Sequence, residues 1–427
     1  MKILFVCHRL PYPPNRGGKI RPFNMIRHLS KKHSVVVASL AGSERELKEG
    51  EGLKDYCDEV IAEVLPDSKR WLQAFRALPT RAPSSVAYFR SSRLHQRIQE
   101  RCLRTNFDVV FVHCAFVAQY VMDVQAGLRV MDFGDLDSAK WADYSKWRSF
   151  PFSHLYAFES AKLRRYEREV ARSFDRCTVI TQGEMGEFKD LRVSTPCSVI
   201  PNGVDLSYFS SSTAGDVGAT VAFLGRMDYF PNIDGVCYFA EKILPRIREK
   251  MPHVEFRIVG SNPTRRVREL AKIPGTVVTG HVPDVRSHLR DVAVTVAPLR
   301  IARGAQNKVL ESMAMGVPVV ATPQAAKGIQ AEVGRDLLVA ETPAVFADRV
   351  LELLENPILR RSLSEAGRKQ VESIYRWETA MDVLDATLAG IGRKRGESIA
   401  GVAPRETSSE CEFGEDNSVF RSNSVGS

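Results

Sequence analysis

The hydrophobic residues of this chain form short continuous runs that alternate with segments of helical spacing. Short apolar runs bounded by glycine or polar residues are typical of strands that are buried on both faces of a parallel sheet. Their alternation with helices predicts an α/β fold with parallel sheets. We expect strands at residues 2–7, 34–40, 107–112, 176–181, 220–225, 256–260, 276–280, 292–298 and 317–320. We expect helices at residues 19–29, 163–174, 308–315, 345–354, 359–375 and 377–388.

The segment 304–320, GAQNKVLESMAMGVPVV, is the most informative stretch of the sequence. Its small-residue loop leads into a helix, which Gly316 ends because glycine readily adopts the left-handed conformation. Lys308 lies in the first turn, where the helix dipole disfavours a cation by about 0.3–1 kcal/mol. Glu311 shares the face of Lys308, in the less favourable order for an ion pair within a helix.

A bound anion would resolve this arrangement of charges. Backbone N–H groups at the start of a helix, together with Lys308, are suited to a diphosphate. Glu311 would point back toward the same helix end, where its carboxylate could accept hydrogen bonds from the hydroxyl groups of a nucleotide. The alternative is a solvated Lys–Glu pair that binds no ligand.

At these residues the sequence resembles the donor half of the family-four glycosyltransferases. That family has two glutamates that flank seven residues, followed by Ala, Gly and Pro-Val-Val. The later elements are present here as Glu311, Ala314, Gly316, Pro318, Val319 and Val320. Arg303 stands in place of the first glutamate. Asn307, Lys308 and Glu311 match a subgroup with an Asn-Lys-x-x-Glu core, and the sequence is similar to the sugar transferases of PEP-CTERM/exosortase exopolysaccharide systems.

The resemblance covers residues 1–391 and implies the GT-B fold, in which two Rossmann-like parallel-sheet domains face each other across a cleft. We expect an acceptor-side domain at 1–205 and a nucleotide-sugar-binding domain at 206–391. Residues 392–427 are rich in Ser, Gly and charge, and we expect a disordered tail there. By resemblance, the last helix, 377–388, crosses back onto the first domain.

The resemblance also implies a donor site that includes residues of the first half. Gly17 and Gly18, in the loop after the first strand, would face the donor diphosphate and sugar; the alternative is an ordinary tight turn. His113, just past the end of a strand, would contact the donor sugar or help to position the reacting groups. The alternative for His113 is a buried core histidine.

In the second half, Arg226 would reach the diphosphate beside Lys308, and Val282 would lie in the loop that holds the nucleobase. Plain strand-to-loop turns are the alternative at both positions. The expected donor-binding residues are Gly17, Gly18, Arg226, Val282, Gly304, Gln306, Asn307, Lys308 and Glu311. The expected catalytic residues are His113, Arg226, Lys308 and Glu311.

Asp135-Leu136-Asp137 matches the D-x-D pattern with which single-domain glycosyltransferases hold a metal ion through the donor phosphates. Three letters carry little information, and Asp137 or Ser138 before a helix is more simply an N-cap. The remainder of the chain resembles the metal-independent two-domain class. We therefore expect no metal and no other cofactor, with the nucleotide-sugar as a substrate.

The length of 427 residues is too great for one ordinary core and favours two domains. No apolar run is long enough to span a bilayer, and the eight cysteines are scattered as in a reduced cytosolic protein. The net charge of +9 indicates an anionic partner, but no zinc-finger spacing or RRM-like motif supports nucleic acid. We expect a cytoplasmic protein that binds no nucleic acid.

One expected helix, 163–174, has a basic face opposite its apolar residues. The basic residues are Arg164, Arg165, Arg168 and Arg172. They are either solvated or in contact with anionic lipid head groups or a lipid-linked acceptor. The second interpretation would make the protein peripheral on the inner face of a membrane.

Together these features predict a glycosyltransferase that moves a sugar from a nucleotide-sugar donor to a hydroxyl group of a glycan or lipid-linked acceptor. The expected setting is exopolysaccharide or lipid-linked glycan biosynthesis. By resemblance the reaction is metal-independent and retains the anomeric configuration. Two alternatives stay open: a nucleotide-sugar epimerase of the same fold, and a non-catalytic nucleotide-sugar-binding assembly protein.

Overall fold

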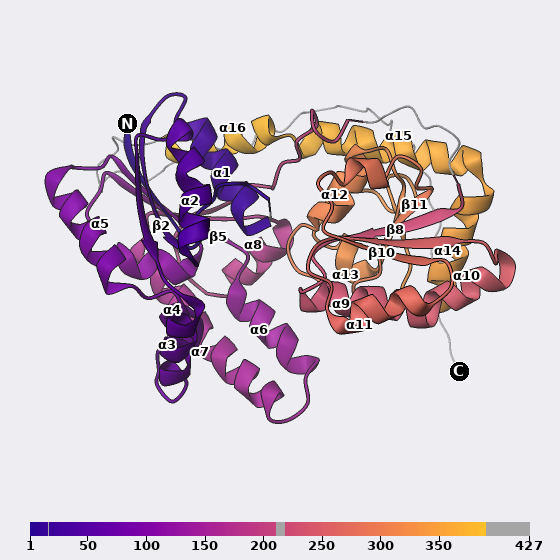
Figure 1. Cartoon of the computed structure of the whole chain (residues 1–427). Helices are drawn as coiled ribbons and strands as arrows, with labels where there is room; N and C mark the ends of the chain where they lie inside the picture. Colours follow the sequence, from indigo (N-terminus) through magenta and orange to yellow (C-terminus); the bar gives the residue numbers. More distant parts are fainter. Residues whose placement is uncertain (16, 211–217, 390–427) are drawn as a thin grey trace, which may run out of the picture. The chain divides into compact units, whose positions relative to one another are not determined.

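The computed structural model describes residues 1–15, 17–210 and 218–389. Two parallel sheets with flanking helices make up this part of the chain (Figure 1). The predicted α/β class is therefore confirmed. The tail that the sequence predicts at 392–427 lies outside the described residues.

The first sheet has seven strands, and every pair of neighbours is parallel. Its spatial order is β3 (Glu59–Val64), β2 (Ser34–Ala41), β1 (Lys2–Cys7), β4 (Val109–His113), β5 (Leu128–Gly134), β6 (Arg176–Val179) and β7 (Cys197–Val199). The central strand β1 is buried along its length after Lys2. This burial on both faces explains why its sequence is a continuous apolar run rather than an alternating one.

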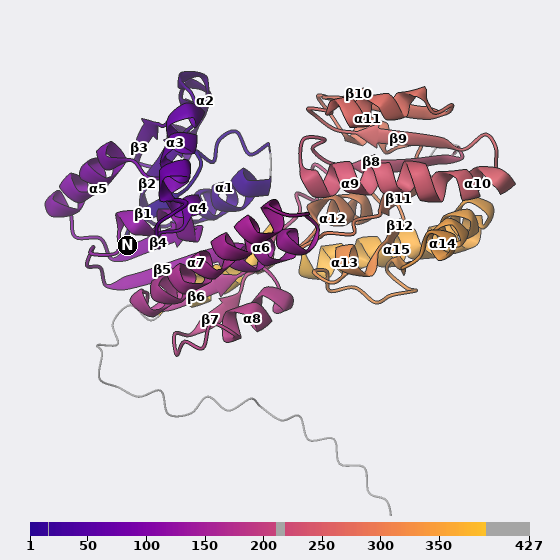
Figure 2. The ribbon, with the colours of Figure 1, turned by 90° about the horizontal axis from the view of Figure 1, so that it is seen from below.

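The second sheet has six strands, which are also all parallel. Its spatial order is β10 (Thr276–Gly280), β9 (Glu255–Val259), β8 (Thr220–Leu224), β11 (Val294–Ala297), β12 (Val319–Ala321) and β13 (Leu338–Val339). Figure 2 shows the strand order of the first sheet and, from β10 to β12, that of the second. In each sheet the order reverses beside the first strand, between β1 and β4 and between β8 and β11. Ligands of such sheets bind outside the carboxyl ends of the strands at this reversal.

The helices are distributed between the two sheets in chain order. Those that follow strands of the first sheet are α1 (Gly17–Leu29), α2 (Glu44–Glu49), α3 (Asp67–Ala77), α4 (Ser84–Tyr88), α5 (Ser92–Arg104), α6 (Asp137–Lys146), α7 (Phe152–Ser173) and α8 (Gln182–Lys189). The later helices are α9 (Phe230–Tyr238), α10 (Leu244–Lys250), α11 (Arg265–Glu269), α12 (Asn307–Ala314), α13 (Pro323–Ala326), α14 (Pro343–Glu355), α15 (Pro357–Ile374) and α16 (Trp377–Leu388).

Different helices cover the two faces of the first sheet. On one face, Leu4 of β1 belongs to the same buried cluster as Ile98 of α5. On the other face, Phe5 of β1 packs in a cluster with Ile26 of α1 and Leu384 of α16. The last described helix therefore completes the core of the first sheet, and Figure 1 shows it beside α1.

Three local expectations from the sequence are corrected by the structure. Helix α1 begins at Gly17, so Gly17 and Gly18 are its first residues rather than part of the preceding loop. Helix α7 begins at Phe152, well before the expected start at residue 163. The N-cap of α6 is Leu136, and its side chain makes no capping hydrogen bond.

The interpretation of Asp137 or Ser138 as an N-cap is therefore wrong. Asp137 is the first residue of α6 and lies 3.6 Å from the ammonium of Lys140. The hydroxyl of Ser138 donates to the carboxylate of Glu167 on α7. Ser138 thus has a tertiary partner that was not visible in the local sequence, whereas the partner of Asp137 lies in its own helix.

Candidate functional site

The loop and helix at 304–316 fold as the sequence predicts. Gly304 has a φ of 62° and Gly316 a φ of 71°, both in the left-handed region. The N–H groups of Gly316 and Val317 donate to the carbonyls of Met313 and Ser312 at 3.0 and 2.9 Å. This pair of hydrogen bonds is the Schellman arrangement, which ends α12 at its glycine.

Lys308 is half-buried in the first turn of α12, near the carboxyl end of β8. Its ammonium donates to the side-chain oxygen of Asn232 at 2.5 Å and lies 4.8 Å from the centroid of the Phe223 ring. Burial lowers the pKa of Lys308 to about 7, although the nearby Glu311 carboxylate acts in the opposite direction. A second anion at this place would favour the charged ammonium.

Glu311 lies one turn after Lys308 and is also half-buried. Burial raises the pKa of the Glu311 carboxyl to about 7, and Lys308 partly offsets this effect. A carboxylate and an ammonium that both lose hydration are unusual at the start of a helix. Perturbed groups of this kind at the end of a sheet mark candidate ligand sites.

Glycine at the end of β8 creates the space for Lys308. Gly225 has a φ of 152°, and a Cβ atom there would lie 2.7 Å from the side-chain nitrogen of Asn232 and 3.4 Å from Cε of Lys308. Asn232 also donates to the backbone carbonyl of Arg226 at 2.8 Å. Asn232 thus holds Lys308 and the loop after β8 together. Asn232 was not predicted as a site residue, because the sequence around it indicates only a loop.

Arg226 and Val282, both predicted to bind the donor, contact other protein side chains in the structure. The guanidinium of Arg226 is held by the carboxylate of Asp228 at 3.1 and 2.5 Å. Val282 follows β10 and packs against a small apolar cluster that includes Leu224 and Val292. Their assignment to the diphosphate and the nucleobase stays a prediction.

His113 is the last residue of β4 and is buried. Its Nδ1 lies 2.7 Å from the carboxylate of Asp132 on β5. The guanidinium of Arg21 donates two hydrogen bonds of 2.9 Å to the same carboxylate, and Thr178 donates one of 2.7 Å. Burial alone would raise the pKa of Asp132, but Arg21 and His113 outweigh it and hold the pKa well below its usual range.

An ionised Asp132 accepts a hydrogen bond from the Nδ1–H group of His113 and so fixes the orientation of the ring. When this ring is neutral, Nε2 is then the nitrogen with the free lone pair. Sequence reasoning found His113 but missed Asp132 and Arg21, which lie 111 residues apart. The position of Asp132 near the end of a buried strand was the one available signal for its role.

The remaining predicted donor residues lie around the start of α12. The side-chain oxygen of Asn307 accepts from Asn202 at 3.3 Å, and a Cβ on Gly17 would lie 3.7 Å from the Asn307 amide nitrogen. Gln306 turns back and donates to the carbonyl of Arg303 at 2.8 Å. The structure therefore brings Gly17 next to Asn307, as a shared site requires.

Two further glycines are packed against polar side chains. A Cβ on Gly304 would lie 2.4 Å from Oδ1 of Asp135, so another residue there would have to displace this carboxylate. A Cβ on Gly18 would lie 3.9 Å from Nε2 of His8, which leaves ordinary space. The close contact with Asp135 therefore gives a packing reason for glycine at position 304.

Arg303, which stands where the family pattern has a glutamate, is surrounded by carboxylates. Its guanidinium donates to Asp143 at 2.5 Å and to Glu187 at 2.9 Å, and it lies 3.6 Å from Glu184. Burial and Asp135 raise the pKa of Glu184 to about 7 despite this arginine. The side chain of Arg303 is thus engaged in an acidic cluster.

The basic face predicted on α7 is only partly available to a partner. Arg164 and Arg168 donate to the backbone carbonyls of Asp190 and Leu191 at 3.0 and 2.9 Å. Arg165 and Arg172 are exposed. Two of the four arginines therefore serve to hold the end of α8.

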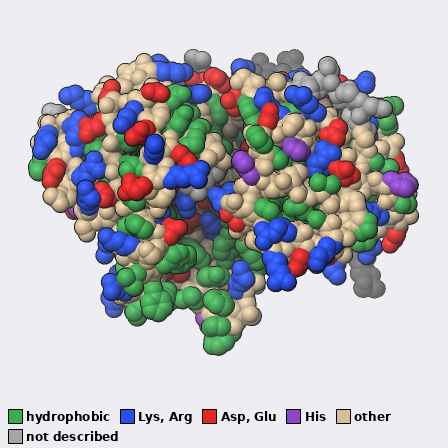
Figure 3. Space-filling model, in the orientation of Figure 1, with side chains coloured by type: hydrophobic (Ala, Val, Ile, Leu, Met, Phe, Trp, Pro, Cys, Tyr) green, Lys and Arg blue, Asp and Glu red, His purple; other side chains and the backbone are tan. Residues whose placement is uncertain are grey.

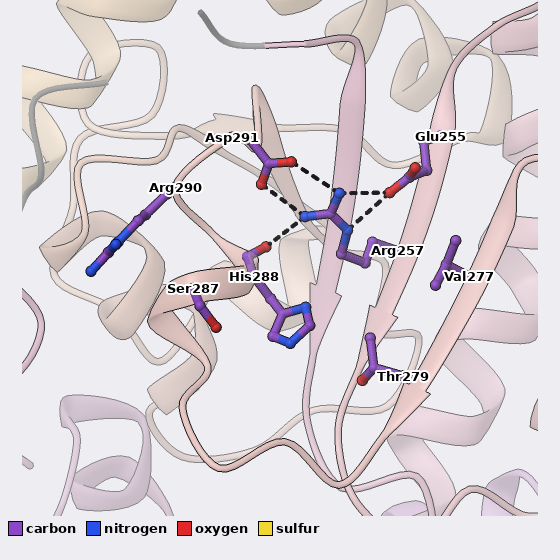
Figure 4. A pocket seen from close by; sticks show the side chains of 8 residues that line it. All are labelled: Glu255, Arg257, Val277, Thr279, Ser287, His288, Arg290 and Asp291. Carbon is purple, nitrogen blue, oxygen red and sulfur yellow. Dashed lines mark hydrogen bonds and ion pairs between the residues drawn. The ribbon is translucent and has the colours of Figure 1, made fainter. Parts of the chain in front are cut away.

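A separate surface hollow of about 460 Å³ lies over β9 and β10 (Figure 4). Its lining residues are Glu255, Arg257, Val277, Thr279, Ser287, His288, Arg290 and Asp291. The guanidinium of Arg257 is bonded to Asp291 at 2.8 and 3.0 Å and to Glu255 at 2.9 Å. Two carboxylates therefore neutralise the charge of Arg257 in this hollow.

The described part of the chain contains neither a cluster of metal-ligating side chains nor a helix able to span a membrane. Among the described residues, no group of three or more His, Cys, Asp and Glu side chains is arranged to hold a metal ion. Across the same residues, no helix combines the length and the apolar character needed to cross a bilayer.

Comparison with known proteins defines the class. The family Glycosyltransferase Family 4 matches residues 16–208, and Glycosyl transferases group 1 matches residues 218–356. The structure of Anabaena HepE in complex with UDP superimposes with a TM-score of 0.66 at 13% identity, over 91% of this chain and 99% of that one. The two-domain Rossmann-like GT-B fold predicted from the sequence is thereby confirmed.

Two curated relatives are also similar. The GDP-mannose-dependent monoacylated alpha-(1-6)-phosphatidylinositol monomannoside mannosyltransferase of Corynebacterium glutamicum is 29% identical over 238 residues. The match covers 49% of this chain and 61% of that enzyme, which is less than two thirds of its length. An uncharacterised 44.6 kDa protein from the cps region of Klebsiella pneumoniae is 19% identical, over 83% of this chain and 91% of the relative. Each half of the chain is therefore similar to a glycosyltransferase family.

Proposed function

We propose that this protein transfers a sugar from a nucleotide-sugar donor to a hydroxyl group of a glycan or lipid-linked acceptor. The observation that carries the proposal is the partly desolvated pair of Lys308 and Glu311 at the start of α12, beside the order reversal of the second sheet. The matched families and the UDP-bound structural relative support it. Exopolysaccharide or lipid-linked glycan biosynthesis, as in PEP-CTERM/exosortase systems, is the proposed setting.

The proposed chemistry follows from the charges that develop during transfer. When the sugar leaves the donor, negative charge grows on the diphosphate. Lys308 and the positive end of the α12 dipole would stabilise this charge without reorganisation. Glu311 would accept hydrogen bonds from nucleotide hydroxyls, and Nε2 of His113 would face the reacting sugar. The family resemblance supports retention of the anomeric configuration.

The proposal extends to the organisation of the chain. Residues 1–205 would form the acceptor side and residues 206–391 the donor side. We assign no metal to the reaction, because Lys308 and the helix start supply positive charge. A cytoplasmic protein at the inner face of a membrane fits a lipid-linked acceptor.

A donor panel tests the proposed activity. The protein should be stabilised by UDP-, GDP- or ADP-sugars, by about 2.7 kcal/mol for the right donor at a hundred times its Kd. With an acceptor extract it should release nucleoside diphosphate, and excess chelator should leave this turnover unchanged. Turnover that stops with chelator and returns with magnesium or manganese would contradict the metal-independent assignment.

The same panel separates the two other functions. An epimerase would convert the donor sugar without releasing nucleoside diphosphate. A non-catalytic binder would show only the stabilisation, and the engagement of Arg303 by Asp143 and Glu187 is the feature that favours such a protein. Restoring a glutamate with Arg303→Glu would then replace this cation by a fourth carboxylate beside Asp143, Glu184 and Glu187 and weaken folding.

Nucleotide affinity should depend on pH through Lys308. In the free protein its pKa is about 7, and a bound diphosphate would raise that value. Binding above pH 7 therefore takes up a proton, and the Kd should increase with pH by up to about tenfold per unit. Calorimetry in buffers of different ionisation enthalpy measures this proton uptake.

The matched variants are Lys308→Met and Glu311→Gln. Lys308→Met should abolish the proton uptake. Glu311→Gln removes the charge that raises the pKa of Lys308, so the increase in Kd should begin at lower pH. A pH-independent Kd in the native protein would contradict the proposed contact of Lys308 with the diphosphate.

A further inference from the structure

Exposed hydrophobic side chains are concentrated in two segments of the first half. Eight of the fifteen large hydrophobic residues that are exposed in the described part of the chain lie in these segments. They are Trp71, Leu72, Phe75, Trp147, Phe150, Phe152, Leu155 and Phe158, which we call the aromatic patch. Figure 3 shows hydrophobic side chains gathered in the region where Figure 1 places α3, α6 and the start of α7. Such concentrations mark interaction surfaces rather than ordinary exposure.

A helix at a protein surface usually buries its apolar side chains, but α3 exposes them. Its buried residues are Arg70, Ala74 and Ala77, whereas Trp71 and Phe75 are 66% and 71% exposed. The buried guanidinium of Arg70 is fixed by the carbonyls of Leu65 and Ala41 at 2.7 and 3.1 Å. The aromatic face of α3 therefore points outward because polar bonds hold the opposite face in place.

The first turns of α7 show the same arrangement. Phe152 and Phe158 are 55% and 52% exposed, and the buried stripe of α7 begins only at Glu159 and Lys162. Glu159 accepts from the backbone N–H and hydroxyl of Ser85 at 2.8 and 2.9 Å. Buried polar contacts again anchor the helix, while its apolar side chains face solvent.

The two segments form one surface. The buried ammonium of Lys162 donates to the carbonyls of Ala77 and Leu78 at the end of α3, at 3.4 and 3.5 Å. The same ammonium lies 4.9 Å from the centroid of the Phe158 ring. Lys162 thus joins the end of α3 to the part of α7 that carries Phe158, so the two segments belong to one side of the first half.

Basic residues accompany the aromatic patch. The exposed ones in segments 67–82 and 146–158 are Lys69, Arg76, Arg81, Lys146 and Arg148. Asp67 is the only acidic residue in those two sequence segments. Aromatic side chains with a basic surround match the chemistry of an anionic lipid surface, where rings enter the head-group region and cations meet the phosphates.

We infer that the aromatic patch inserts into the interface of an anionic lipid bilayer. The membrane-binding surface is then formed by α3 and the start of α7, not by the four arginines at 164–172, two of which are bonded to backbone carbonyls. This surface does not include Lys308, Glu311 or His113. Substitutions in the aromatic patch therefore leave these three side chains unchanged.

The test uses the full chain and vesicles of phosphatidylcholine with or without phosphatidylglycerol. The native protein should co-sediment with the anionic vesicles and bind the neutral ones much less, and salt should weaken binding. Phe150→Ser with Phe152→Ser, or Trp71→Ser with Phe75→Ser, should weaken partition by about tenfold or more. Lys69→Gln with Arg76→Gln should reduce binding to the anionic vesicles by about fivefold per charge.

Two matched controls use exposed residues outside the patch. Leu103→Ser with Ile358→Ser removes two equally exposed apolar side chains, and Arg165→Gln with Arg172→Gln removes two exposed charges from α7. Both should bind like the native protein, and all variants should retain their melting temperature. The inference is overturned if the native protein binds neither vesicle, or if the patch variants bind unchanged. It is also overturned if sedimentation shows that the native protein is a dimer and that the patch variants are monomers.

Discussion

Lys308→Ala should lower kcat by about 10²–10³-fold, since the contact of this ammonium strengthens as the leaving diphosphate gains charge. The folded structure should survive, because Lys308 opposes the helix dipole and is partly desolvated without ligand. Steady-state kinetics with the donor found by the panel, together with a thermal melt of the free protein, measure both effects. A destabilised free protein with unchanged turnover would make Lys308 a structural residue.

Glu311→Ala provides the contrast within the same helix. Contacts with nucleotide hydroxyls change little between the ground state and the transition state, so their loss should raise the donor Kd more than it lowers kcat. A loss of kcat equal to that of Lys308→Ala would show that Glu311 also acts in the transition state and not mainly in donor binding.

Asp132→Asn should cause the largest loss of stability, about 3–5 kcal/mol in the free energy of unfolding. The substitution leaves the buried guanidinium of Arg21 without its counter-charge and removes the carboxylate that orients His113. Thr178→Val is the matched control, since it removes one hydrogen bond to the same carboxylate and should cost about 1 kcal/mol. Denaturant unfolding measures both values, and equal costs would contradict the importance of the charge.

The loss of stability caused by Asp132→Asn should also depend on pH. The pKa of Asp132 is depressed in the folded protein. Its stabilisation is therefore fully present above about pH 4, the ordinary pKa of an aspartate in an unfolded chain, and declines as the pH falls below that value. The difference between the native protein and Asp132→Asn should be constant from neutral pH to about pH 5 and shrink in acid.

The sequence was most informative where a strand is buried on both faces. β1, β8 and β10 lie within a residue of their predicted bounds, because continuous apolar runs have one interpretation in a parallel sheet. Helix α12 was found for a second reason: Gly316 marks its end. These signals are local, so one sequence suffices to read them.

The start of α7 and the whole of α3 were not predicted, because both helices expose their aromatic residues and bury charged ones. A search for an apolar stripe facing a core assumes the opposite orientation. The Asp132 network escaped for another reason. Arg21, His113 and Asp132 come from three separate elements, and only the folded sheet brings them to one place.

Helix α16 is the last described element to leave the ribosome, yet Trp377 and Leu384 belong to the core that also contains Phe5 and Ile26. During synthesis the part of this sheet face that α16 covers therefore stays exposed until the rest of the described chain has been made. Apolar sheet faces that wait in this way are prone to association with other nascent chains. A polypeptide released at residue 205 would carry this uncovered face permanently, so the first half depends on the end of the chain for its own solubility.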